Sequence, residues 1–135
     1  AQNRLARGEA EFLPAGSRTS AYALGQPVDA YRLDLVPAAE VEETLGDEAV
    51  FAGEAFAAPA GTRDIDLVRD VLEPGEETEI ALGSVDAPAV LHVTDGSLEF
   101  LSADDEDAEP NRLSAGEAAE VIGELIVRAG DEGAT

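Results

Sequence analysis

The sequence predicts an all-β protein, an antiparallel barrel or sandwich, and three observations point to this class. Short apolar stretches recur along the chain and are separated by Gly, Pro, Asp and Asn, which is typical of strands joined by tight turns. Several stretches alternate apolar with polar residues, as a strand with one buried face does, and residues 31–35 are an example. The length of 135 residues allows one core without disulfide or metal support.

Ten strands are expected from these stretches. They cover residues 10–13, 19–24, 30–36, 50–56, 65–72, 77–81, 89–94, 97–102, 117–122 and 125–128. The pair Asp95-Gly96 separates two of them and is of the kind that two-residue hairpin turns favour. The strands are short and closely spaced, so most neighbours along the chain are expected to pair in antiparallel fashion.

Two stretches between the expected strands have a different character. One or two helical turns are expected at Ala38–Leu45, because Pro37 ends the preceding strand, glutamates occur early in the stretch and Gly46 follows it. The acid-rich stretch at residues 104–111 indicates a solvated hairpin loop. A dedicated calcium loop is not expected there, because the alternating ligands and fixed glycine of such loops are missing.

The charge of the chain excludes two classes of partner. There are 30 acidic residues against 8 cationic ones, all of them arginine, and the net charge is −22. Such a chain has no basic surface with which to displace counterions from nucleic acid, and an anionic membrane surface repels it. No apolar stretch approaches the about 18 to 20 residues of a membrane span. We therefore expect neither a nucleic-acid nor a membrane partner.

Cysteine is absent, which excludes disulfides and thiol chemistry but leaves the compartment open. The acidity fits a halophile, a high-GC genome or a secreted protein, and composition does not separate these sources. The expected localisation is that of a soluble protein, either cytoplasmic or secreted with its signal removed.

The N-terminal part contains a glycine and proline pattern with a recognisable spacing. Gly8, Pro14 and Gly16, followed by Thr19 and Ala23, fit G-x5-P-x-G-x2-H-x3-N, in which Pro-x-Gly makes a tight turn. This segment resembles the second conserved motif of the cupin superfamily. In metal-binding cupins the histidine of this motif points into the barrel as a ligand. Here Thr19 takes the place of the histidine, and Ala23 that of the asparagine.

Residues 73–100 resemble the first cupin motif, G-x5-H-x-H-x3,4-E-x6-G. Counting from Gly75, Ala81 and Gly83 stand at the two histidine positions. Counting back from the glycine that closes the motif, Ala89 stands at the glutamate position. All three usual ligands of this motif are therefore replaced, while its turn residues are kept.

The order of the motifs divides the chain. A weaker copy of the second motif follows at residues 113–135, with Gly116 in register. Residues 1–37 then resemble the closing half of one cupin repeat, residues 38–62 form a linker with a short helix, and residues 63–135 resemble a second repeat. The resemblance implies a cupin-like antiparallel β-barrel, a double-stranded β-helix or jelly roll, and a fragment of a two-cupin protein. One compact barrel, with strands swapped between two chains or not, is the alternative.

The sequence assigns no catalytic residue, metal ligand or cofactor. His92 is the only histidine, and strand alternation places it on the face opposite to Ala89, Leu91 and Val93, so a packing or interface role is expected. One histidine without cysteine cannot build a nitrogen and sulfur metal site within one chain. The serines lack a plausible histidine base for nucleophilic catalysis.

The first set of candidate binding residues comprises the small and apolar side chains at the lost ligand positions and beside them. These residues are Ala81, Gly83, Ala89 and Leu91. They are expected to line the interior, together with Val93, and the interior is either filled core or a pocket for a small apolar molecule.

The second set of candidates comprises Thr19, at the lost histidine position, and two arginines. Arg18, which stands beside Thr19, and Arg69 would hold a small organic acid in two parallel hydrogen bonds if they lay in or beside a cavity. The alternative for such arginines in an acidic protein is an ion pair at the surface or at an interface.

The leading functional expectation is a non-catalytic, metal-free cupin-like module that binds a small molecule or assembles with another chain. A homodimer formed through sheet faces or strand exchange is the expected partner state. Two alternatives remain: an enzyme with a non-standard carboxylate site, and a sensor or carrier that binds a small organic acid through a cavity arginine. The carboxylates on or near the expected barrel strands are Glu77, Glu79, Asp86 and Glu99.

Overall fold

The computed structural model describes residues 4–17, 23, 25–44, 46–47, 49–84, 87–105 and 107–135. The chain divides into two compact units, Ala1–Val36 and Pro37–Thr135. The strand expected at residues 19–24 lies largely outside the described residues.

The described residues of the first unit contain turns but neither helix nor strand. One turn joins Ala6 to Glu9, and a second joins Pro14 to Ser17, whose N–H donates to the Pro14 carbonyl over 3.0 Å. The Pro-x-Gly turn expected from the sequence is thus confirmed. The strands expected at residues 10–13 and 30–36 are wrong: these residues are almost all exposed and form no strand.

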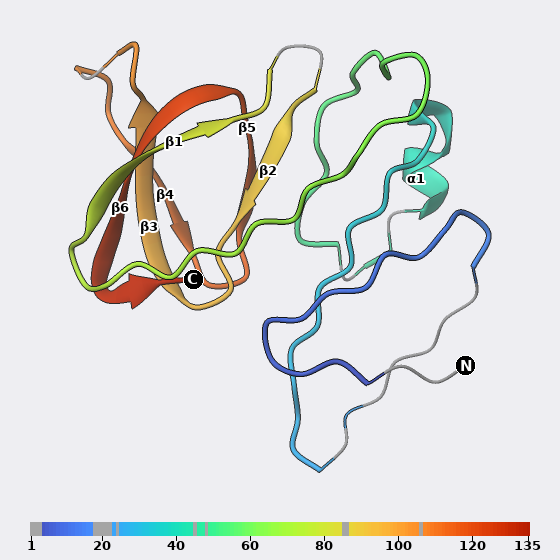
Figure 1. The fold of residues 1–135 in the computed structure, drawn as a ribbon, viewed down its shortest axis with the longest axis horizontal. Helices are drawn as coiled ribbons and strands as arrows, with labels where there is room; N and C mark the ends of the chain where they lie inside the picture. The colour runs from blue at the N-terminus through green and yellow to red at the C-terminus, as the bar shows by residue number, and fades with distance from the viewer. Residues whose placement is uncertain are drawn as a thin grey trace. The chain divides into compact units, whose positions relative to one another are not determined.

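The second unit begins with a short helical segment. A 3-10 turn, η1 (Ala38–Glu40), leads into α1 (Val41–Thr44), which confirms the helical turns expected after Pro37 (Figure 1). The described residues that follow, up to Val71, form no strand, so the strands expected at residues 50–56 and 65–72 are also corrected. Leu72 makes an isolated antiparallel bridge with Ala134.

The regular β-structure lies in the C-terminal half of the chain, and its strands form two antiparallel sheets (Figure 1). The strands are β1 (Glu77–Leu82), β2 (Ala89–His92), β3 (Gly96–Ser102), β4 (Asn111–Ser114), β5 (Ala118–Val121) and β6 (Gly123–Ala134). One sheet has the order β1-β6-β3-β4, and the other pairs β2 with β5. The all-β class is therefore confirmed. The expected acidic loop joins β3 to β4, and β4 itself was not predicted.

Alternation along the strands separates a buried face from an outer face. The buried residues are Val93, Leu98, Phe100, Leu113, Val121, Leu125, Val127, Ala129 and Ala134. Removing a Leu, Val or Phe side chain of this kind from water stabilises the fold by about 1.5 to 3 kcal/mol. The residues between them along β3, β4 and β6 face outward, because successive side chains of a strand point to opposite faces. The core thus lies on the inner face of the four-stranded sheet.

Three turns share one hydrogen-bonding arrangement that ends in glutamate. In each, the N–H of the glutamate donates to the carbonyl of the residue three positions earlier, while its carboxylate accepts the N–H of that same residue. The pairs are Ala6 with Glu9, Glu73 with Glu76, and Ser114 with Glu117. A glycine precedes the glutamate in every case. These turns fix the chain directions before β1 and between β4 and β5.

Candidate functional site

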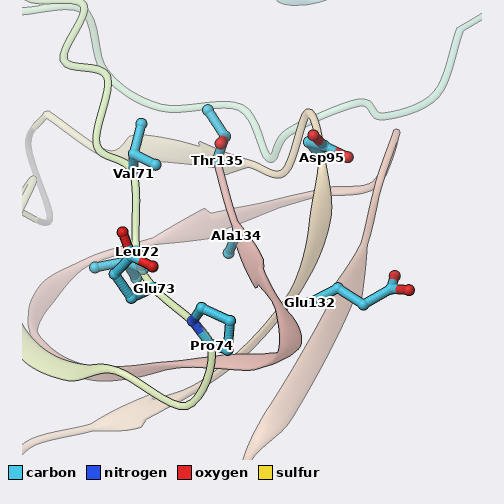
Figure 2. Close-up of a pocket in the computed structure, with 8 residues that line it drawn as sticks. All are labelled: Val71, Leu72, Glu73, Pro74, Asp95, Glu132, Ala134 and Thr135. Carbon is cyan, nitrogen blue, oxygen red and sulfur yellow. The ribbon is translucent and has the colours of Figure 1, made fainter.

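A recess of about 220 Å³ lies beside the C-terminal part of β6 (Figure 2). Eight residues line it: Val71, Leu72, Glu73, Pro74, Asp95, Glu132, Ala134 and Thr135. They come from the segment that leads into β1, from the turn between β2 and β3, and from β6 with the residue after it. The recess is therefore built where three separate parts of the β-structure meet.

Main-chain hydrogen bonds hold these three parts together. The Leu72 N–H donates to the Ala134 carbonyl over 2.9 Å, and the Ala134 N–H donates back over 3.1 Å. On the other side, the Thr135 N–H donates to the Asp95 carbonyl over 3.0 Å. Gly133 allows this close approach, because a Cβ atom there would lie 2.7 Å from the Leu72 carbonyl oxygen. The walls of the recess are thus set by backbone pairing.

The charge of the recess opposes an acidic ligand. Its charged side chains are Glu73, Asp95 and Glu132, and no arginine among the described residues lines it. A small organic acid would meet like charge there and would lack a fork of donors. The three carboxylates belong to three different segments (Figure 2). Across the described ranges, no group of three His, Cys, Asp or Glu side chains is placed to hold a metal ion.

The residues expected to line the interior are distributed differently from the prediction. Ala81 is exposed on the outer face of β1, and Ile80 and Leu82 pack against the core instead. The residues of β1 that face inward are thus shifted by one position from those expected from the lost ligand positions. A shift of one residue moves a side chain to the opposite face of the strand. The larger apolar side chains take the buried side because their burial releases more free energy.

The other interior candidates contribute to packing and to a turn. Ala89 and Leu91 pack against the core beside the buried Val93, so this interior is filled core. Gly83 is exposed in the turn after β1, and a Cβ atom there would lie 2.8 Å from the Ala89 main-chain nitrogen. The expectation that residues 89, 91 and 93 share the inward face is confirmed.

Of the two arginine candidates, Arg69 belongs to the described residues. Arg69 is exposed in the segment before β1 and lines neither the recess beside β6 nor the second one described below. Arg18 and Thr19 lie outside the described residues. The described ion pair is instead local: the Arg32 Nε atom lies 2.8 Å from the Asp34 Oδ1 atom on the exposed part of the first unit.

His92 lies on the outer face of the two-stranded sheet, where β2 places it opposite Ala118 of β5. Burial lowers the pKa of the His92 imidazole below its ordinary value of 6.5. The same face carries Glu120, whose carboxylate accepts the Glu54 N–H over 2.7 Å. A Cβ atom on Gly53 would lie 2.9 Å from the same carboxylate oxygen. Residues 53 and 54 thus lie against this face.

The outer face of the four-stranded sheet carries an ordered row of charges. Glu77 of β1 is paired in register with Arg128 of β6, Arg128 with Glu99 of β3, and Glu99 with Arg112 of β4. We call these four residues the charge row. The candidate carboxylates Glu77 and Glu99 therefore belong to the outer face of the sheet rather than to the interior. Sequence reasoning missed this row because neighbours across a sheet are set by register.

Two apolar residues lie next to the charge row on the same face. Ile126 of β6 is paired with Leu101 of β3 and with Glu79 of β1, and both apolar side chains are half-buried. An open recess of about 660 Å³ lies over this part of the sheet. It is lined by Glu77, Thr78, Glu79, Leu101 and Ile126. The outer face thus has an apolar centre beside a row of alternating charge.

Comparisons with known proteins return no match: no family model, no curated protein and no solved structure is similar to the chain. No helix in the described ranges has the length and apolar character needed to cross a bilayer.

Proposed function

We propose that this protein is a non-catalytic, metal-free module that assembles with a second copy of itself, and that its β-structure has cupin-like jelly-roll topology. The observation that carries the assembly role is a series of large apolar side chains that are exposed between residues 5 and 71. They are Leu5, Phe12, Leu13, Val28, Tyr31, Leu33, Leu35, Val50, Phe56, Ile65, Leu67, Val68 and Val71. Both compact units thus expose large apolar side chains to water, and packing against a partner removes that apolar area from water.

The spacing of these side chains favours a sheet-forming partner. Tyr31, Leu33 and Leu35 alternate with polar residues and are 47%, 65% and 63% exposed. A stretch with this alternation gains stability when one face packs on apolar surface and its main chain pairs with a strand. A second copy supplies such a surface by strand exchange or sheet packing, without any further component.

Small-molecule binding receives less support. The interior next to Ala89 and Leu91 is filled by core side chains, and the recess beside β6 is small and acidic. Ligand sites in proteins are usually larger apolar clefts with a few converging polar groups. Neither the recess beside β6 nor the one over the outer face has this character.

The cupin-like topology is supported by the turn residues. The glycines at the motif positions all have positive φ, a backbone conformation that glycine adopts without steric cost. They are Gly8, Gly16, Gly75, Gly96 and Gly116. Gly8 and Gly116 each open a copy of the second motif. The turns that contain them share the pair of hydrogen bonds made by the glutamate that follows. Backbone geometry can persist in a scaffold after its ligands are replaced.

Sedimentation velocity of the full chain over a concentration series tests the assembly role. The variant Leu33→Ser/Leu35→Ser should raise the dissociation constant of the assembly at least about tenfold, because two apolar side chains lose their burial. The control Gln26→Ser/Ala30→Ser changes neither charge nor a large apolar group and should leave it unchanged. A wild-type chain that sediments as a monomer at every concentration contradicts the proposal.

Metal analysis tests the metal-free part of the proposal separately. The purified protein is exposed to manganese, iron, nickel and zinc, dialysed and analysed for bound metal. Substoichiometric retention is expected for all four, because the residues at the motif positions offer no nitrogen, sulfur or carboxylate donor. Retention of one equivalent of any of these ions would overturn it.

A further inference from the structure

We infer that the outer face of the four-stranded sheet is a second, self-complementary interface at which two copies of the chain pack face to face. It shares no residue with the exposed apolar residues at positions 5–71. The inference starts from the placement of the cations. Arg112 and Arg128 are the only cationic residues that follow Arg69 in the sequence, and both belong to the charge row. In a region so rich in acidic residues, this placement makes one strip of the surface locally neutral.

The order of charge across the sheet is what makes the strip self-complementary. Following the strand order β1-β6-β3-β4, the row runs Glu77, Arg128, Glu99, Arg112, so its sign alternates from one edge to the other. The second copy is generated by a rotation of 180° about an axis that runs parallel to the strands, in front of the outer face and opposite the gap between β6 and β3. In this second copy the order of the charges across the sheet is reversed. Each glutamate of one copy then faces an arginine of the other.

The same rotation brings the apolar centres together. Ile126 and Leu101 are cross-strand partners next to the charge row, so the twofold axis passes between them as well. Ile126 of one copy then faces Leu101 of its partner. Packed sheets keep their strand directions within about 30° of each other, so rows of one sheet lie over rows of the other near the axis. This is an isologous contact, in which the same surface serves both copies.

The charge of the chain limits the alternatives for the occupant. A basic partner would be attracted to the surface of this acidic protein in general, and nothing would favour the locally neutral row over it. Another acidic protein would require its own alternating row to match. A second copy carries that row by symmetry, and its half-buried Ile126 and Leu101 supply a matching apolar centre.

Two charge reversals test this geometry in the full chain. Arg128→Glu places two glutamates against each other at both central contacts of a homodimer, and Glu99→Arg places two arginines there. Each variant alone should weaken self-association through this face at least about tenfold, because like charges opposed across an interface cost several kcal/mol. An equimolar mixture of the two variants should restore association, because each contact then joins unlike charges. A purely intrachain role for these residues predicts no restoration.

The measurement is sedimentation velocity with one variant carrying a fluorescent label, at about 0.15 M salt, where the Debye length of about 8 Å limits long-range repulsion between copies. The controls Arg4→Glu and Asp107→Arg make the same charge changes at exposed positions outside the strands and outside positions 5–71, and should self-associate like the wild type. Circular dichroism confirms that each variant keeps its β-structure.

Restored association in the mixture supports the interface even if Leu33→Ser/Leu35→Ser has no effect, so the two contacts succeed or fail independently. Folded single variants that self-associate like the wild type overturn the inference. Weakened single variants whose mixture stays equally weak overturn it as well.

Discussion

Glu117 and Ser114 are joined by two hydrogen bonds in opposite directions. The Glu117 carboxylate accepts the Ser114 N–H over 2.7 Å, and the Glu117 N–H donates to the Ser114 carbonyl over 2.9 Å. The same double contact closes the turn before β1, between Glu73 and Glu76. The glutamate therefore contributes twice to the turn: its carboxylate accepts the first N–H of the turn, and its own N–H closes the turn.

Glu117→Ala should lower the free energy of unfolding by about 1 kcal/mol, because it removes a charge-assisted hydrogen bond from a partly solvated turn. Glu117→Gln keeps an acceptor and should lose less. The measurement is urea unfolding followed by circular dichroism. Glu109→Ala, in the exposed loop between β3 and β4, is the control, and equal midpoints for Glu117→Ala and Glu109→Ala would show that the lock adds nothing.

Gly133→Ala should destabilise the protein more than Gly123→Ala. Both glycines belong to β6 and have positive φ, 80° and 91°, so both substitutions carry the backbone cost of about 1 to 2 kcal/mol for an L residue. At Gly133 the new Cβ atom would also lie 2.7 Å from the Leu72 carbonyl oxygen, whereas at Gly123 it meets open space. The excess loss in urea unfolding measures the close approach beside the recess. Equal losses would mean that the Leu72 segment moves away freely.

His92 should make stability depend on pH. Its pKa in the folded protein is lowered by burial below 6.5, so the unfolded chain binds more protons between the two pKa values. The free energy of unfolding therefore rises with pH through this window, and the contribution is lost as pH falls through the folded pKa. Urea unfolding between about pH 5 and pH 7 should give a smaller pH slope for His92→Gln than for the wild type. Parallel slopes would place the pH dependence elsewhere.

Glu120→Ala should release the segment at Gly53 and Glu54. The Glu120 carboxylate is the acceptor for the Glu54 N–H, so its loss should speed hydrogen exchange of that amide severalfold while the core amides of β6 stay protected. Glu124→Ala, an exposed glutamate on β6, is the control. If the hydrogen-exchange rate of the Glu54 amide were unchanged in Glu120→Ala, the Glu120 carboxylate would not be what holds this segment.

Most of the C-terminal β-structure was predictable because local signals and global packing agree there. Pro74-Gly75 and Asp95-Gly96 mark turns, and the apolar alternation between them supplies one face for the core. β4 was missed because Leu113 is its one large apolar residue, which is too little periodicity to detect. The three Gly-Glu turns were detectable in principle, since the dipeptide recurs five times in the chain, but only the main-chain geometry distinguishes the locked ones.

Too many strands were predicted before residue 72. Alternation of apolar and polar residues favours a strand, but a strand forms only where a partner strand pairs with it. Tyr31, Leu33 and Leu35 have the alternation of a strand but form none in the structure. The wrong face for Ala81 has a related origin. The motif position predicted that Ala81 faces inward, whereas the burial of Ile80 and Leu82 decided which face of β1 is inward. The charge row depends on pairing between distant strands, which no local pattern contains.

The position of β6 has a consequence for how the protein is made. β6 lies between β1 and β3 in the sheet, although the ribosome synthesises it after both. Until it emerges, β1 has no neighbour in its sheet and β3 has only β4, so the nascent chain exposes strand edges that invite misassembly. Folding of this sheet must therefore wait for long-range closure, and slow acquisition of structure is expected.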